Sequence, residues 1–261
     1  MRHVLITGAS SGIGRALALS YAAPEVMLTL AGRDKARLDD VATRCRAAGA
    51  VVATLAIDVQ DRAAMAAALA AVDGRAPLAL AIACAGITSG TGSDHPFEDP
   101  EAVRGVLGVN IFGVLNTLDP LIAPMTRRRS GHLAIVTSLA ALRGLPSSPA
   151  YSAAKAAILA YGEGLRPTLA RHGVTLSLVA PGFVETPLNA AIHAPRPLQI
   201  DAATAARRIR RGLDRRRPLI AFPFPLYLGL RLLGLLPAAL GDRILDRPGI
   251  EVPQTSERWR G

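Results

Sequence analysis

The chain is poor in the residues that build disulfide-stabilised domains and metal sites. Two cysteines, Cys45 and Cys84, are present among 261 residues, so nothing in the sequence supports a disulfide framework or a metal site. Aromatic residues make up 4% of the chain, and none interleave with the basic stretches, which argues against nucleic-acid binding. The N-terminus lacks the apolar core and cleavage site of a signal peptide, so we expect a cytoplasmic protein.

Acidic residues are also scarce. The chain has 20 Asp and Glu against 30 Lys and Arg, which gives a net charge of +10. This excess fits attraction to a membrane surface or another polyanion, although an arginine- and alanine-rich composition accounts for much of it. Half of the residues are apolar and 19% are charged, a balance typical of globular rather than disordered chains.

What the chain does contain is a regular alternation of apolar strands and helices. Strands are predicted at residues 3–7, 26–31, 51–57, 78–83, 132–138, 174–180 and 218–222. Helices are predicted at residues 13–23, 34–48, 61–73, 98–127, 150–172 and 201–214. This alternation predicts an α/β fold, in which a doubly wound parallel sheet of about seven strands carries helices on both faces. Ligands of such a sheet bind beyond the carboxyl ends of its strands.

A glycine-rich loop joins the first predicted strand to the first helix. Within it, Gly8 permits a tight turn, Gly12 lets the backbone approach a pyrophosphate, and Gly14 allows close packing of helix and strand. The helix N-terminus offers unpaired amides for phosphates. The spacing is Gly-x-x-x-Gly-x-Gly and not the standard Gly-x-Gly-x-x-Gly. We expect a Rossmann-like dinucleotide site with contacts from Gly8, Ser10, Ser11, Gly12, Ile13 and Gly14.

Tyr151 and Lys155 lie four residues apart on a predicted helix, so their side chains leave the same face. An ammonium beside a phenol favours the phenolate and would lower the pKa of Tyr151. Ser138 ends an apolar strand, and Asn110 lies in an apolar helix. Simpler structural roles exist for both: Ser138 as a strand-end cap, and Asn110 as a buried side chain satisfied by a backbone carbonyl.

Pro181-Gly182 and Thr186 follow the next predicted strand. Together with the motifs above, they occur in the order and at the separations typical of the short-chain dehydrogenase/reductase family. The chain resembles this family over about residues 3–190. The resemblance implies hydride transfer between a nicotinamide and a carbonyl or secondary alcohol. It implies Tyr151 as acid/base, Ser138 as the holder of the substrate oxygen, Lys155 on the nicotinamide ribose and Asn110 positioning a water that links Lys155 to solvent. It also implies a homo-oligomer, either a dimer or a tetramer.

The chain departs from the family where Asn-Asn-Ala-Gly is usual after the fourth strand. Ala83 and Cys84 replace the two asparagines, so we expect a cofactor pocket with different local bracing. Cys84 is interpreted as a small buried filler. The remaining cofactor contacts that the resemblance implies are Ala85, Gly86, Tyr151, Lys155, Pro181, Gly182, Val184 and Thr186.

The end of the second strand favours NADP(H) over NAD(H). An acidic residue there would bind the ribose 2′-hydroxyl of NAD, whereas arginine accommodates the 2′-phosphate of NADP. The residues are Gly32 and Arg33, and Asp34 is expected to cap the next helix. Alternatively, Arg33 is a solvated side chain and either cofactor is accepted. Asp58 and Val59 either lie near the adenine ring or simply begin a turn.

The C-terminal third leaves more alternatives open. The resemblance implies a mobile substrate lid at residues 183–200, and the apolar content of this segment suggests an apolar or lipid-like ketone or alcohol substrate. We expect the domain to span residues 1–246, with a basic and apolar helical extension over about 203–246 and a polar, loosely held tail at 247–261. The apolar part is shorter than the about 20 residues that span a bilayer. It either closes the pocket, forms a subunit interface or contacts the inner face of the membrane peripherally. A non-catalytic dinucleotide sensor or scaffold is the alternative function.

Overall fold

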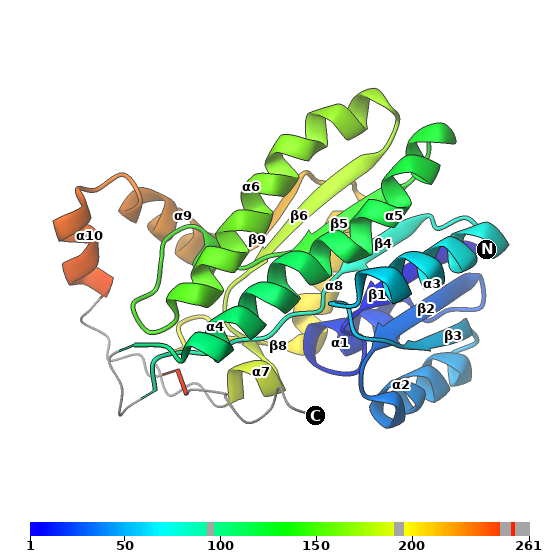
Figure 1. Cartoon of the computed structure of the whole chain (residues 1–261), viewed down its shortest axis with the longest axis horizontal. Coiled ribbons are helices and arrows are strands. Elements are labelled where there is room, and N and C mark those ends of the chain that lie inside the picture. Colours follow the sequence, from blue (N-terminus) through cyan, green and yellow to red (C-terminus); the bar gives the residue numbers. More distant parts are fainter. Residues whose placement is uncertain (93–96, 191–195, 246–251, 254–261) are drawn as a thin grey trace.

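A seven-stranded parallel sheet forms the centre of the computed structural model (Figure 1). The structure describes residues 1–92, 97–190, 196–245 and 252–253. The sheet contains β1 (Arg2–Thr7), β2 (Val26–Gly32), β3 (Val51–Ala56), β4 (Leu80–Ala83), β5 (His132–Val136), β6 (Thr175–Pro181) and β9 (Leu219–Phe222). Their spatial order is β3-β2-β1-β4-β5-β6-β9. The order reverses between β1 and β4, so a crevice for a ligand opens beyond the carboxyl ends of these two strands.

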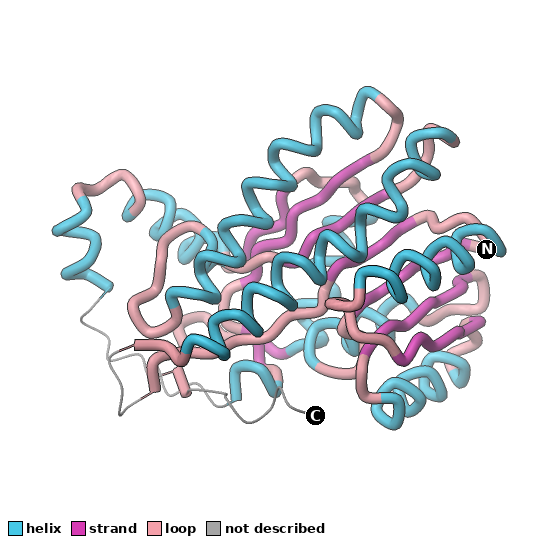
Figure 2. The backbone as a smooth tube through the Cα atoms, viewed as in Figure 1, coloured by secondary structure: helices cyan, strands magenta, loops and turns pink. Residues whose placement is uncertain are grey.

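Helices cover both faces of the sheet (Figure 2). One face carries α1 (Gly12–Tyr21), α2 (Lys35–Ala47) and α8 (Ala202–Asp214), and the other carries α3 (Arg62–Arg75), α5 (Gly113–Arg127) and α6 (Pro149–Arg171). Side chains alternate between two apolar cores: Val4 and Ile6 of β1 pack on the first face, and Leu5 packs on the second. Near-continuous apolar strands are therefore required, because both faces of the sheet are buried.

The predicted strands and helices are all present within a few residues of their expected bounds. The expected helix at 98–127 begins later, as α4 (Pro100–Leu107), because the Asp99 carboxylate caps it by accepting a hydrogen bond from the Ala102 amide at 2.8 Å. A π-helical turn (Gly108–Phe112), which the sequence did not predict, joins α4 to α5. Smaller elements were also not predicted: β7 (Val184–Glu185), β8 (Ile200–Asp201), a 3₁₀ turn (Leu139–Ala141) and α7 (Pro187–Ala190).

The continuous helix Pro100–Arg127 is, by length and composition, apolar enough to cross a membrane. Half of its most apolar stretch is buried inside the domain, and Val114, Leu118 and Leu121 belong to the core on the second face of the sheet. A core helix of a globular domain has this composition too, so we interpret Pro100–Arg127 as such a helix.

The expected C-terminal helical extension is present as α9 (Phe224–Leu233) and α10 (Ala238–Leu245). In Figure 1 the two helices project from one end of the domain, on the side of β9 and α6. The described part of the expected loose tail is packed and not loose. Val252 is buried, and its carbonyl accepts a hydrogen bond from the Gly92 amide at 2.9 Å. The rest of the 247–261 segment, and part of the predicted lid at 191–195, lie outside the described residues.

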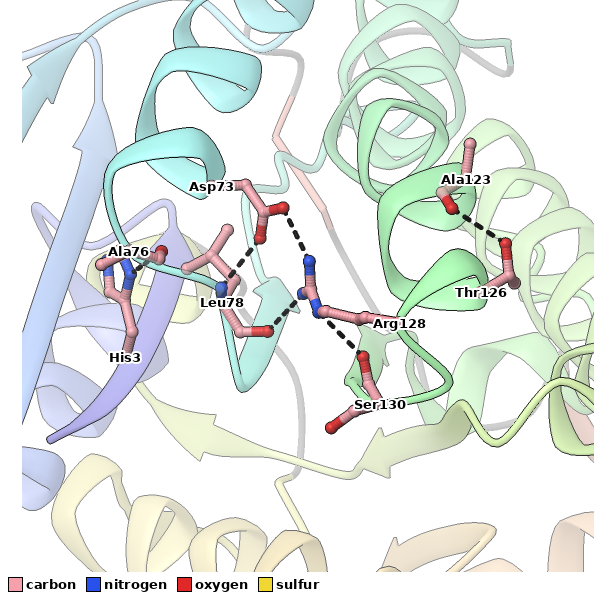
Figure 3. A network of polar contacts seen from close by, with 8 residues as sticks. All are labelled: His3, Asp73, Ala76, Leu78, Ala123, Thr126, Arg128 and Ser130. Atoms are coloured by element: carbon pink, nitrogen blue, oxygen red, sulfur yellow. Dashed lines mark hydrogen bonds and ion pairs between the residues drawn. The ribbon is translucent and has the colours of Figure 1, made fainter.

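An ion pair near the start of β4 ties α5 to α3 (Figure 3). The Arg128 guanidinium is 2.7 Å from the Asp73 carboxylate and donates to the carbonyls of Leu78 at 2.8 Å and Ser130 at 3.1 Å. The second Asp73 oxygen accepts a hydrogen bond from the Leu78 amide at 2.8 Å. Both charged side chains are largely buried, and their polar atoms are paired, which fixes the end of the sheet opposite the ligand crevice.

His132 is a buried, neutral side chain on β5. The Ser177 hydroxyl donates to the Arg217 carbonyl at 2.6 Å, so it must accept the hydrogen bond from His132 Nε2 at 2.8 Å. Burial lowers the pKa of His132 from 6.5 to about 4. The positive charges of Arg216 and Arg2 act in the same direction, and the negative charge of Asp214 opposes them. The imidazole therefore carries its proton on Nε2 and stays uncharged at neutral pH.

We predict that acid destabilises the protein through His132. In the unfolded chain His132 binds a proton below about pH 6.5, whereas in the folded chain it does so only below about pH 4. The free energy of unfolding is therefore at its full value above pH 6.5 and decreases as the pH falls from 6.5 towards 4. Between pH 7 and 5 the loss is about 2 kcal/mol. The measurement is the urea midpoint at both pH values for wild type and His132→Gln, in which an amide replaces the imidazole donor. The matched control is His172→Gln at an exposed helix end. An unchanged pH dependence in His132→Gln would contradict the assignment.

Candidate active site

The glycine loop between β1 and α1 has the conformation that its sequence predicts. Gly8 has φ +66°, and a Cβ there would lie 2.8 Å from the Ala85 Cα. A Cβ on Gly14 would overlap the Gly8 carbonyl. Gly12 has φ +50° and faces the Thr186 side chain. Side chains are therefore excluded where the loop approaches β4 and the start of α1, which leaves the α1 amides directed at the crevice.

Thr7 braces the end of β4, where the chain continues from Ala83 into Cys84 and Ala85. Its hydroxyl oxygen accepts hydrogen bonds from the amides of Cys84 at 3.1 Å and Ala85 at 3.2 Å. The Cys84 side chain packs partly against the first core. Burial raises the pKa of its thiol to about 12, against the effect of the nearby Lys155 charge, so the thiol is protonated and unreactive at neutral pH.

Three predicted catalytic side chains meet at the carboxyl end of β5. Ser138 follows β5, and its hydroxyl hydrogen-bonds the Tyr151 hydroxyl, while Lys155 Nζ lies 5.7 Å from the centre of the Tyr151 ring. The Lys155 ammonium donates to the Val136 carbonyl at 3.1 Å. The Thr137 hydroxyl donates to the Lys155 carbonyl at 2.8 Å and so holds α6 against β5. Ser138 also caps the following turn by accepting from the Ala140 amide at 3.1 Å, so its two proposed roles are compatible.

The pKa of Tyr151 is raised, contrary to the expected lowering. Burial of the phenol is the largest cause, and the hydrogen bond with Ser138 opposes it. The expectation was wrong because Lys155 is directed at the Val136 carbonyl and the ring, and because it is itself buried. Burial lowers the pKa of Lys155 to about 8. Tyr151 is therefore a protonated hydroxyl at neutral pH, which suits it to proton donation.

Asn110 lies behind the catalytic side chains, in the π-helical turn. Its side chain is fully buried, donates to the Ile87 carbonyl at 2.8 Å and accepts from the Ile87 amide at 3.0 Å. A Cβ on Gly86 would lie 3.0 Å from Asn110 Oδ1 and 3.3 Å from Lys155 Nζ, so the absence of a side chain at Gly86 lets these groups approach. The backbone-satisfied role of Asn110 is thus present, and its part in a water relay stays a prediction.

One cavity of about 1210 Å³ contains the Ser138, Tyr151 and Lys155 site and every predicted cofactor contact. It runs from the glycine loop past Arg33, Asp58 and Val59 at the ends of β2 and β3 to Pro181, Gly182, Val184 and Thr186 after β6. Asn110 lies outside this lining. The C-terminal extension lines the cavity through Leu226, Leu230 and Leu245, in agreement with the pocket-closing alternative for this segment. The sequence did not point to the other lining residues Leu145, Ser147, Val252 and Pro253. The four-residue spacing of Leu226 and Leu230 on α9 was the one signal that could have identified part of the lining.

The residues predicted to select the cofactor lie at the ends of β2 and β3. The Asp34 carboxylate caps α2 by accepting from the Arg37 amide at 2.9 Å and pairs with the Arg37 guanidinium, as predicted for a capping residue. Arg33 lies 3.9 Å from the Asp58 carboxylate. Asp58 also accepts from the Gln60 amide at 2.9 Å, so it begins a turn and lines the cavity at the same time.

A family model for short chain dehydrogenases matches residues 2–197. The chain is a short-chain dehydrogenase. A Myxococcus xanthus (strain DK1622) protein described as an uncharacterized oxidoreductase is 36% identical over 94% of this chain and 97% of its own length. A short-chain dehydrogenase from Sphingobium yanoikuyae, solved with NADPH, is 26% identical with a TM-score of 0.78 over 92% of this chain and 98% of that one. One from Burkholderia phymatum, solved with NAD, is 27% identical with a TM-score of 0.79 over 94% and 95%.

Membership of the short-chain dehydrogenases settles the general activity. The protein is a nicotinamide-dependent oxidoreductase with a Rossmann-like α/β fold. Related structures contain either NADPH or NAD, so the fold is compatible with both cofactors. No group of three potential metal ligands gathers anywhere in the described part of the chain.

Proposed function

We propose that the protein is an NADP(H)-dependent dehydrogenase/reductase that interconverts a carbonyl and a secondary alcohol on an apolar substrate. The observation that carries the proposal is the meeting of Ser138, Tyr151 and Lys155 in the same cavity as the glycine loop. The loop fits a dinucleotide because the α1 amides face the cavity, and the glycines leave room for phosphates. The nicotinamide supplies the hydride.

Tyr151 and Ser138 act on the substrate oxygen in this proposal. In the reductive direction the protonated Tyr151 hydroxyl transfers its proton to the carbonyl oxygen, and Ser138 donates a hydrogen bond to the charge that develops there. The interaction of the Ser138 hydroxyl with Tyr151 places the two side chains side by side in the cavity. Lys155 binds the ribose of the cofactor, and its position near Asn110 supports a proton path from the buried site through a water that Asn110 positions.

The arrangement at β2 supports a preference for NADP(H). Asp34 is the only carboxylate within two residues of Gly32. Its side chain accepts a hydrogen bond from the Arg37 amide and forms an ion pair with the Arg37 guanidinium. Arg33 lines the cavity at the place where the adenosine ribose of a dinucleotide is bound in doubly wound folds. A guanidinium there provides a forked, charge-assisted contact to a 2′-phosphate.

Arg33→Ala is expected to weaken NADPH binding about 10- to 100-fold and NADH binding by less than about threefold, since a charge-assisted hydrogen bond contributes about 1.5–3 kcal/mol. Nicotinamide fluorescence titrations measure both affinities. Arg44→Ala on α2, which removes an exposed guanidinium paired with Asp40, is the matched control and should change neither. Equal losses for both cofactors in Arg33→Ala would remove the assignment.

The far end of the cavity supports an apolar substrate. It is lined by Leu139, Leu145, Phe183, Leu226 and Leu230, of which Phe183 belongs to the 183–200 segment that we propose as the lid. We further propose a cytoplasmic homo-oligomer, a dimer or tetramer, with peripheral contact to the inner face of the membrane through the C-terminal helices. Phe112 and Tyr161 are exposed on the helices of the second face, which supports subunit contacts there.

A further inference from the structure

The C-terminal helices α9 and α10 have an apolar face that belongs to the substrate cavity. Leu226 and Leu230 of α9 and Leu245 of α10 line the cavity. A Cβ on Gly182 would lie 3.4 Å from the Leu226 side chain and 3.3 Å from that of Leu139. The pair of helices therefore forms part of the cavity wall close to the catalytic end of β6.

The same helices present a second apolar face to solvent. On α9, the exposed side chains Phe224, Leu228 and Leu232 are four residues apart and so form one stripe. On α10, the exposed side chains Leu240 and Ile244 are likewise four residues apart. Leu236 is exposed between the two helices, as is Leu235, which is 81% exposed. Exposed apolar side chains gathered on two successive helices are uncommon on a soluble monomer and mark an interaction site.

Charge decides which partner this surface fits. Arg231 and Arg243 are exposed beside the stripe, and Arg231 lies over the Tyr227 ring. Asp242 is the only acidic residue in the 219–245 segment, and it is paired with Arg143 at 2.6 Å. A second copy of this surface would offer the arginines no carboxylate from the 219–245 segment that is not already paired. An anionic bilayer complements both features, because its headgroups pair with the arginines and its acyl region accepts the apolar side chains.

We propose that the outward stripe of α9 and α10 binds an anionic bilayer surface, and that the substrate enters the cavity from this bilayer. The outward leucines lie at the acyl boundary while the inward leucines face the bound substrate, so only one layer of helices separates the lipid from the active site. The substrate class is then a membrane-dissolved ketone or secondary alcohol with a long apolar body. This substrate assignment rests on the proposed redox function, whereas the lipid-binding surface deepens the proposed membrane contact and does not depend on the redox chemistry.

The test uses the full chain with NADPH and sedimentation with vesicles of phosphatidylcholine alone or mixed with phosphatidylglycerol. We expect binding to the anionic vesicles that weakens as salt increases. The variant Leu228→Ser/Leu232→Ser/Leu240→Ser should bind at least tenfold more weakly, and Arg231→Gln/Arg243→Gln severalfold more weakly. Matched controls elsewhere on the surface are Val51→Ser/Phe97→Ser and Arg62→Gln/Arg75→Gln, which replace exposed residues and should bind like wild type.

NADPH affinity and reduction of a panel of water-soluble ketones are measured on the same samples. The surface variants should retain both, which shows that they are folded. If wild type does not bind anionic vesicles, or if the leucine variant binds them equally well, the proposed lipid-binding surface is wrong. The proposed redox activity is not affected by this result. Dissociation of a wild-type oligomer by the leucine variant, seen by analytical ultracentrifugation, would instead assign the stripe to a second copy. Vesicle binding without turnover of any ketone, soluble or vesicle-dissolved, would leave the surface standing and overturn the proposed function.

Discussion

Tyr151→Phe is expected to lower kcat for ketone reduction about 10³-fold while leaving NADPH affinity within about twofold. The substitution removes the hydroxyl that is proposed to give its proton to the substrate oxygen, and positioned proton transfer contributes about 10²- to 10⁴-fold. The phenyl ring keeps the packing of α6. Turnover is followed by nicotinamide absorbance and cofactor binding by fluorescence.

The matched control is Tyr161→Phe, which lies on the same helix. Its hydroxyl is 3.4 Å from the Asp119 carboxylate and points away from the cavity lining, so activity should be unchanged. If Tyr151→Phe reduced ketones as fast as wild type, the proton-donor role would be wrong. If wild type bound NADPH and turned over no ketone, the sensor alternative would be favoured.

Gly14→Ala is expected to weaken NADPH binding at least 100-fold. A Cβ at this position would overlap the Gly8 carbonyl and crowd the Ala9 Cα. Both are backbone atoms that cannot move without reshaping the phosphate loop. The fold should survive, because the apolar cores on the two faces of the sheet do not depend on the loop. Calorimetric titration measures the affinity, and circular dichroism checks the fold.

Gly74→Ala is the control for a helical glycine, since a Cβ there meets nothing within 4 Å. It should leave binding unchanged and stabilise α3 by up to about 1 kcal/mol, because alanine has the higher helix propensity. NADPH binding by Gly14→Ala at wild-type strength would mean that the loop adapts, and the cofactor-loop geometry would need revision.

Most of the fold and the cofactor side of the site could be predicted from the sequence, because their signals are local. Strand-end residues such as Ser138 and Arg33 are placed by the parallel sheet itself, and Tyr151 and Lys155 are placed by one helix. The glycine loop is specified by residues that only a sharp turn and a close backbone approach require.

The direction of the Tyr151 pKa shift could not be predicted in the same way. Helical spacing places Lys155 on the correct face, but it does not show that the ammonium donates to the Val136 carbonyl or that both groups are buried. Those facts depend on the packing of α6 against β5. Likewise, Thr7 as the brace of Cys84 and Ala85 depends on the neighbouring positions of β1 and β4.

By itself, the sequence determined the order of strands and helices, the glycine loop and the candidate catalytic groups, since each is encoded in a short segment. Tertiary structure alone decided that α9, α10 and Val252 line the cavity, and that leucines on one side of α9 face the cavity while those on the other face solvent. The physical reason is that burial depends on contacts between segments far apart in the chain. An apolar repeat predicts that a helix has an apolar face, but it does not predict which segment or solvent that face contacts.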